Sequence, residues 1–176
     1  MTLSPAQLAT LKTDINANTT QITVGGVATA IKDLPNNGDV NVEIAAWYNL
    51  PTAAFWVWRT FVRDQDIYSL ASVDATTWSW SIFIARSQGE RDAWRQMVNM
   101  AGGLNPSLVN VRAGVADIFS GAGGAAQRTH LLTIGRRLAT NAEKLFSTGT
   151  GDTANPATMA FEGIVTGNDV TAARNS

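Results

Sequence analysis

The clearest pattern of apolar positions lies in residues 127–146, QRTHLLTIGRRLATNAEKLF. Spacings of three and four place its apolar residues on one stripe of a helix, while the charged residues fall largely on other faces. The residues of the stripe are Leu131, Ile134, Leu138, Ala142 and Leu145. Because threonine and glycine follow from residue 148 onward, the pattern predicts one helix that ends near Phe146.

Weaker helical patterns cover most of the chain before this stretch. Ser4 and Pro5 combine a capping residue with one that suits the first helical position. Further helices are predicted over residues 27–34, from Asp39 to residue 50, from about residue 74 to residue 100, and from residue 107 to residue 119. The stripe of the helix from Ser107 and that of the helix from Gln127 are expected to pack on each other, with Phe119 and Leu138 in the core. We therefore predict a mainly α fold, a helical bundle that occupies residues 1–147.

The run AFWVWRTFV at residues 54–62 fits two structures. Phe55, Val57 and Val62 could lie on one face of a strand, or the run could be a buried helix. Trp56 and Trp58 fit the core of a helical body, but tryptophan is also common at interface anchors. They are therefore candidate partner-binding residues of the body, together with the basic pair Arg136 and Arg137.

The last thirty residues have no helical period until a short turn at the end. Residues 148–156 are small and polar, and the alternation that follows predicts one short strand. A single strand after such a linker does not stabilise itself. We therefore predict that residues 148–176 form an extended arm that docks on a partner chain. Its candidate contacts are Met159, Phe161, Ile164 and Val165, and truncation after Phe146 is expected to leave a folded body.

Composition excludes several classes of function. The chain has 176 residues and no cysteine, which excludes disulfides, zinc thiolates and thiol catalysis. The N-terminus lacks the basic and apolar regions of a signal peptide, and no apolar run is long enough for a membrane span. We expect the protein to be made and kept in a cytoplasm.

Charge is nearly balanced in total and uneven along the chain. The net charge is −1, which gives no general attraction to nucleic acid or to an acidic membrane. Residues 1–85 carry four basic and seven acidic side chains, and residues 86–147 carry eight basic and four acidic ones. This asymmetry could orient one chain on a neighbour, although two solvated faces of different composition explain it equally well.

Candidate catalytic chemistry is sparse. His130 is the only histidine, and no serine or cysteine nucleophile accompanies it. Asp64 and Asp66 have the spacing of a metal-binding pair, but no third carboxylate or glycine completes a calcium loop. The sequence therefore predicts no catalytic residue, no cofactor and no metal site.

Two stretches, about a third of the chain, carry a resemblance to a known family. LPNNGDVNVEIAAWYNLP at residues 34–51, with FWVWRT after it, resembles the N-terminal half of a family of small structural proteins of tailed bacteriophages. AEKLFSTGTGDTANPATMAFEGIVTGNDVTAARN at residues 142–175 resembles the C-terminal signature of the same family. The chain is longer than the small adaptors of the phage neck, which are helical bundles with an extended C-terminal arm.

The resemblance implies a structural subunit of the head-to-tail connector, an adaptor that forms a homo-oligomeric ring beneath the portal protein. Partners would be the portal and neighbouring neck or tail proteins, and genomic DNA could pass through the ring without sequence-specific binding. Localisation would be the virion, at the head-tail junction, after assembly in the host cytoplasm. Alternatives are another minor virion role (neck, tail terminator or decoration) and, from a different class, a small phage-encoded enzyme that uses Asp64, Asp66 or His130.

Overall fold

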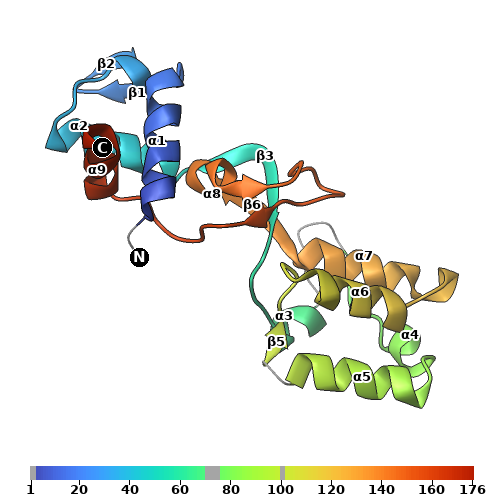
Figure 1. The fold of residues 1–176 in the computed structure, drawn as a ribbon. Helices are drawn as coiled ribbons and strands as arrows, with labels where there is room; N and C mark the ends of the chain where they lie inside the picture. Colours follow the sequence, from blue (N-terminus) through green and yellow to red (C-terminus); the bar gives the residue numbers. More distant parts are fainter. Residues whose placement is uncertain (1–2, 70–75, 100–101) are drawn as a thin grey trace. The chain divides into compact units, whose positions relative to one another are not determined.

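The computed structural model describes residues 3–69, 76–99 and 102–176, and the chain divides into two compact units (Figure 1). Unit 1 consists of residues 1–55 and 138–176, and unit 2 consists of residues 56–137. The chain passes from unit 1 to unit 2 along β3 (Pro51–Trp58) and returns along β6 (Arg136–Thr140), and these two strands pair with each other. The predicted division at residue 147 is therefore wrong, because the C-terminal residues fold with the N-terminal ones.

Unit 1 begins with α1 (Pro5–Ala17), which starts where the sequence predicts. The Ser4 hydroxyl accepts from the Gln7 backbone N–H at 3.2 Å, and the Gln7 side chain accepts from the Ser4 N–H at 2.9 Å. The next segment was predicted to be a helix and is a hairpin instead. β1 (Gln21–Val24) pairs with β2 (Val27–Ala30) through Gly25 and Gly26, which both have positive φ. Two adjacent left-handed residues suit a tight hairpin turn, and glycine adopts them without strain.

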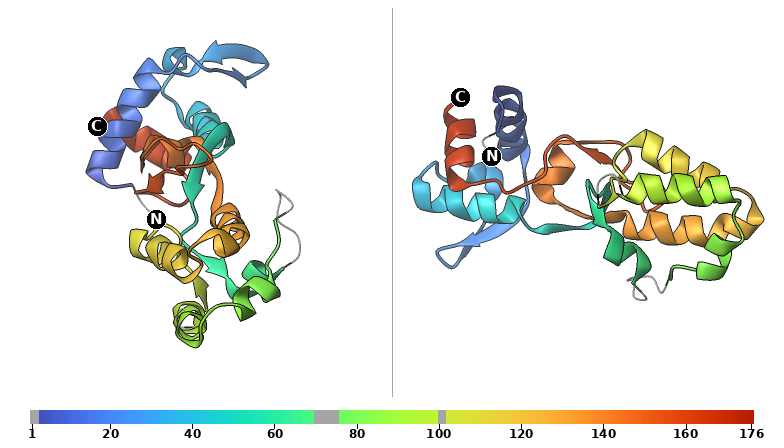
Figure 2. Two further views of the ribbon diagram at one scale, coloured as in Figure 1. Left: turned by 90° about the vertical axis from the view of Figure 1, so that its right-hand side faces the viewer. Right: turned by 90° about the horizontal axis from the view of Figure 1, so that it is seen from below.

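A short 3-10 helix, η1 (Ile31–Asp33), leads to α2 (Gly38–Tyr48). Asn37 caps α2 by accepting from the Val40 N–H at 3.0 Å, two residues before the predicted cap at Asp39. The C-terminal helix α9 (Gly167–Asn175) packs on both α1 and α2, as Figures 1 and 2 show. These three helices enclose the core of unit 1, whose largest fully buried side chains are Leu11, Ile15, Ile31, Ile44 and Tyr48.

The stretch 127–146 is not one helix. α7 (Ala125–Ile134) ends at Gly135, β6 follows, and α8 (Asn141–Leu145) starts anew with a capping box between Thr140 and Glu143. A Cβ at Gly135 would lie 2.9 Å from the Leu131 oxygen and 3.1 Å from the Pro106 side chain, so the chain passes Pro106 closely here. Leu138 then lies in a strand and is only half-buried, which corrects its predicted place in a helical core.

The remaining short strands complete unit 1 and resolve the ambiguous run. β7 (Ser147–Thr148) pairs antiparallel with β8 (Thr158–Met159), which is all that the structure retains of the strand predicted in the arm. The run at residues 54–62 could have been a strand or a buried helix. Its residues 54–58 belong to β3, so this part is a strand. Its partner β6 supplies the hydrogen bonds that a lone apolar run cannot.

Unit 2 is mainly helical. Its elements are β4 (Val62–Arg63), α3 (Asp64–Tyr68), α4 (Trp80–Ile84), α5 (Gln88–Asn99), β5 (Gly103–Leu104), α6 (Val109–Ile118), the 3-10 helix η2 (Ala122–Gly124) and α7. The long helix predicted from residue 74 to residue 100 is two helices, and its predicted ends lie outside the described residues. The break falls where the Glu90 carboxylate accepts from the Ser87 N–H and hydroxyl, both at 2.7 Å, and so caps α5. Helices therefore dominate both units, but four two-stranded sheets interrupt them within the described residues, so the fold is not the single bundle that we predicted.

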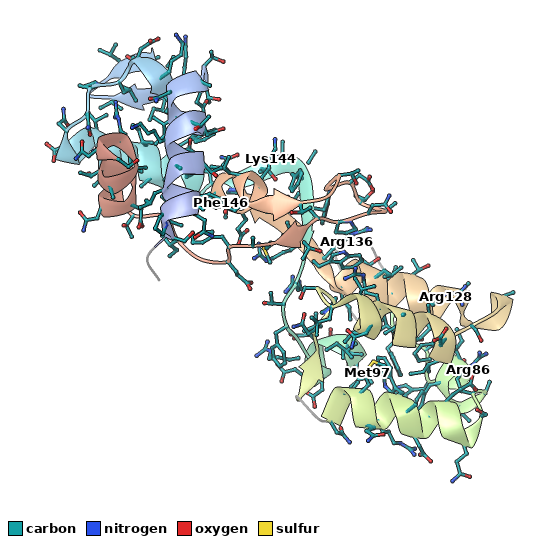
Figure 3. All side chains as sticks on the ribbon, in the orientation of Figure 1. Arg86, Met97, Arg128, Arg136, Lys144 and Phe146 are labelled. Carbon is teal, nitrogen blue, oxygen red and sulfur yellow. The ribbon has the colours of Figure 1, made fainter. Side chains whose placement is uncertain are left out.

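Aromatic rings fill the core of unit 2. Trp94 is 1% exposed, stacks on Trp78 at 5.3 Å between ring centroids, and meets Phe119 edge-on at 5.4 Å. The predicted packing between the stripes of 107–119 and 127–134 is confirmed, because Val115, Phe119 and Leu131 share this core. Met97 packs against the same core and extends from α5 toward Gly114 of α6, where a Cβ would lie 2.6 Å from its methyl carbon (Figure 3).

Two glycines of unit 2 should respond to alanine in opposite directions. A Cβ at Gly124 would lie 2.0 Å from the Phe119 carbonyl oxygen, so Gly124→Ala is expected to destabilise the protein by about 1–3 kcal/mol. A Cβ at Gly89 in α5 would meet nothing within 4 Å, so Gly89→Ala should stabilise the protein by up to about 1 kcal/mol. Urea unfolding of both variants measures this. A neutral Gly124→Ala would mean that the turn between Phe119 and Gly124 has room for a methyl group.

Candidate functional site

The four residues predicted to bind a partner from the arm separate into two groups. Phe161 is 4% exposed and Val165 is 1% exposed, and both lie in the core of unit 1. Asn49 holds Val165 in place, because its amide nitrogen donates to the Val165 carbonyl at 2.8 Å and its amide oxygen accepts from the Val165 N–H at 2.9 Å. Phe161 and Val165 are therefore core residues, which corrects their assignment as partner contacts. Ile164 is 70% exposed and Met159 is half-buried, and their contact with a partner stays a prediction.

The candidate residues of the body lie in unit 2, close to the paired strands. Trp58 is buried, and the guanidinium carbon of Arg112 lies over it at 4.7 Å from the Trp58 ring centroid. Trp58 is therefore not available as an exposed anchor. Trp56 is half-buried under Arg136, whose guanidinium carbon is 5.2 Å from the ring centroid. Arg136 and Arg137 are both half-buried. Trp56, Arg136 and Arg137 stay predicted partner contacts.

Asp64 and Asp66 have local structural roles at the start of α3. The Asp64 carboxylate accepts from the Gln65 N–H at 2.7 Å, and Asp66 forms an ion pair with Arg63 at 3.1 Å. Across residues 3–69, 76–99 and 102–176, no group of three or more histidine and carboxylate side chains could hold a metal ion. The two aspartates therefore stabilise the first turn of a helix, where negative charge is favourable.

His130 is buried inside unit 2 with both ring nitrogens engaged. Its Nε2 lies 2.8 Å from the Ile67 carbonyl oxygen, and its Nδ1 lies 3.1 Å from the Thr76 hydroxyl. A carbonyl only accepts, so Nε2 carries a proton and donates to the Ile67 oxygen. The ring links α7 to α3 and to the segment before α4, which is a structural role.

Arginines of unit 2 bind mainly to backbone carbonyls near the ends of helices. Arg91 donates to the Ile84 and Arg86 carbonyls at 2.7 and 3.0 Å, and Arg86 donates to the Ser120 carbonyl at 3.2 Å. Arg128 donates to the Phe119 and Gly121 carbonyls, and Arg112 to that of Pro106; Figure 3 labels Arg86 and Arg128. Cations are favourable at helix C-termini, and a neutral carbonyl leaves their formal charge in place.

The two units consequently carry opposite net charge. Unit 1 contains four basic and eight acidic residues, a net charge of −4, and unit 2 contains nine basic and six acidic residues, a net charge of +3. The uneven distribution of charge along the sequence therefore becomes a difference between the two units. The acidic unit also contains residues 138–176, which carry more acidic than basic groups. Each unit can attract the unlike unit of another chain.

An exposed stripe on α2 combines apolar and acidic side chains. Asp39, Val42, Glu43 and Ala46 follow helical spacing on the face opposite the core, and Leu50 lies just beyond the helix. Val42 is 57% exposed and Leu50 is 55% exposed. We call these five residues the α2 stripe. Exposed valine and leucine beside two carboxylates form a surface that a basic, partly apolar partner would fit.

Unit 2 has an exposed apolar surface near the start of α6, and the basic residue Arg112 lies beside it. Leu108 is 47% exposed and Val109 is 70% exposed, and the exposed Leu132 of α7 borders a depression of about 20 Å³ beside them. The depression is also lined by Trp58, Pro106, Val111 and Arg112. We call this surface the α6 depression. A volume of about 20 Å³ has room for about one methyl group, and the Arg112 side chain lines the depression.

Comparisons of the chain with models of protein families, with curated proteins and with solved structures found no match. None of the helices in the described ranges is long and apolar enough to cross a membrane.

Proposed function

We propose that this chain is a structural subunit of the head-to-tail connector of a tailed bacteriophage, and that its copies form an oligomeric ring between portal and tail. The observation that carries the proposal is the opposite net charge of the two units, −4 and +3. A contact between unlike surfaces of neighbouring copies is heterologous, and it generates a ring when the rotation between copies closes.

The α2 stripe of one copy would meet the α6 depression of the next. A methyl group of Val42 or Leu50 would enter the depression, while Asp39 and Glu43 would approach Arg112 and the basic surface of unit 2. Desolvation by burial lowers the pKa of Arg112, but an arginine remains charged at every physiological pH. An apolar centre with charges at its rim is the usual composition of a specific interface.

Salt should therefore control the assembly of the purified protein. The mass distribution, measured by mass photometry or sedimentation velocity, is expected to shift from rings to single chains as sodium chloride is raised, because exposed charges are screened. Glu43→Lys is expected to weaken the assembly about tenfold or more, since it places like charges together in the contact. Asp33→Lys is the matched control: it makes the same charge change on an exposed residue of unit 1 outside the α2 stripe.

Equal weakening by both variants would mean that net charge alone drives the association and that the α2 stripe is not the contact. A single chain at every salt concentration would contradict the ring. The station in the virion is tested separately by electron cryomicroscopy of particles from the phage that encodes the chain. Density for the chain on the capsid surface, or at the far end of the tail, would favour a decoration or tail role over the connector.

A further inference from the structure

A polar cavity of about 690 Å³ opens within unit 1, where α1, α2 and α8 meet. Its lining includes Asp14, Asn18, Trp47, Tyr48, Asn141 and Lys144. The volume is in the range of small-molecule sites, which usually combine an apolar wall with a few placed polar groups. The ring contact proposed above does not use this cavity, and of its lining residues Tyr48 also belongs to the core of unit 1.

The polar wall of the cavity is held in place by hydrogen bonds. The Tyr48 hydroxyl donates to Asp14 Oδ2 at 2.5 Å, and the Asn18 amide donates to the same oxygen at 3.3 Å. Burial, together with the hydrogen bond to Asp14 and the charge of Asp14, raises the pKa of Tyr48, so the phenol stays protonated and remains a donor. Within the described residues, Asp14 Oδ1 accepts no hydrogen bond, so the half-buried carboxylate keeps one oxygen for a ligand.

Asn141 adds a second oriented polar group from the opposite side of the cavity. Its amide nitrogen donates to the Trp47 carbonyl at 2.9 Å, and its backbone N–H donates to the Leu50 carbonyl at 3.0 Å. Its amide oxygen takes no hydrogen bond from the part of the chain that the structure describes. Asp14 and Asn141 therefore offer acceptors on fixed side chains, and a ligand would bind them without much loss of side-chain entropy.

The rest of the lining limits what such a ligand can be. Half-buried Trp47 and Leu145 supply an aromatic and an aliphatic surface. The Asp14 carboxylate repels phosphate and carboxylate groups, and Lys144, labelled in Figure 3, lies over the Phe55 ring at 5.7 Å from its centroid. A purely apolar ligand would leave the acceptors desolvated and unpaired, which is costly. A pyranose fits both conditions, since its hydroxyls donate to carboxylate and amide oxygens and its C–H face packs on an aromatic ring.

We infer that this cavity is a binding site for a neutral saccharide, with Asp14 and Asn141 as hydroxyl acceptors and Trp47 as the stacking surface. Such a site gives the protein a recognition function that is independent of ring assembly. The inference does not rest on the proposed function, so either could fail alone.

Titration of the full chain with maltose, cellobiose, lactose and N,N′-diacetylchitobiose at millimolar concentrations tests the site. Binding is followed by saturation-transfer difference NMR and by the indole N–H resonances of the protein. At least one of these sugars is expected to shift the Trp47 indole resonance. Asp14→Asn still accepts from the Tyr48 hydroxyl. It is expected to lower the affinity for that sugar about tenfold or more, because a hydrogen bond to a charged group is lost.

Asp33→Asn is the matched control, since it removes one exposed carboxylate of the same unit outside both the cavity and the α2 stripe, and it should leave binding unchanged. Lys144→Gln should change the affinity less than twofold if the ligand is neutral. The inference would be overturned if none of the four sugars perturbed the spectra, or if Asp14→Asn and Asp33→Asn weakened binding equally. Loss of binding with Lys144→Gln and gain with Asp14→Asn would identify an anion site instead.

Discussion

Truncation after Phe146 is expected to unfold unit 1. The removed residues include Phe161, Val165 and Val170, which are at most 4% exposed and lie in its core. Burial of such side chains stabilises a fold by about 1.5–3 kcal/mol each, and small domains have only about 5–15 kcal/mol in total. The cut also removes Arg174, which donates to the Leu34 and Pro35 carbonyls and fixes α9 against the turn before α2.

Amide NMR spectra of the truncated and full chains measure this result, and the resonances of residues 56–137 serve as an internal reference. Two neighbouring substitutions provide a control that keeps the chain length. Val165→Ala should cost about 1–3 kcal/mol because Val165 is 1% exposed, and Ile164→Ala should stay within about 0.5 kcal/mol because Ile164 is 70% exposed. A truncated chain with native unit 1 resonances would restore the body-and-arm division that the sequence predicts.

Trp94→Ala is expected to be the most destabilising single substitution in unit 2. It removes a ring that packs on Trp78 and Phe119, and it also removes the bond from the indole nitrogen to the Tyr68 hydroxyl at 3.3 Å. Loss of a buried tryptophan costs about 3–5 kcal/mol, since the surrounding rings close the cavity only in part. Phe119→Ala, at the same cluster, should cost a similar amount.

Urea unfolding followed by near-ultraviolet circular dichroism reports these rings. Ile84→Ala is the control within the same unit, because Ile84 is 65% exposed and should contribute less than about 0.5 kcal/mol. The transition of unit 1 should not move in any of these variants, since the two units have separate cores. A loss below about 1 kcal/mol in Trp94→Ala would show that the aromatic cluster does not stabilise unit 2.

The candidate surfaces could be predicted only in part. Arg136, Arg137 and Trp56 keep enough exposure for the predicted partner contact, but Trp58, Phe161 and Val165 do not. Burial of these three depends on partners distant in sequence, such as Arg112 above Trp58 and Asn49 beside Val165. No pattern in the sequence predicts the cavity of unit 1, because Asp14, Tyr48 and Asn141 come from three separate helices and share no motif.

Features that depend on a few neighbouring residues were determined by the sequence itself. Ser4 and Pro5 start α1, the turn at residues 35–38 precedes α2, and the stripe of 107–119 packs on that of 127–134. Capping groups and proline act within one turn of the backbone, so their effect is the same in any fold.

Only the tertiary structure decided the rest. Residues 136–140 have helical spacing, yet they form a strand because β3 offers an edge and Gly135 passes too close to Pro106 for a side chain. Residues 148–176 have the composition of a free arm, yet Phe161, Val165 and Val170 are buried because α1 and α2 leave a surface that α9 covers. The same event increases the charge difference between the units, because residues 138–176 add a net charge of −2 to the −2 of residues 1–55 when the chain returns along β6. Contacts between residues far apart in the sequence decide these outcomes, and no local pattern contains them.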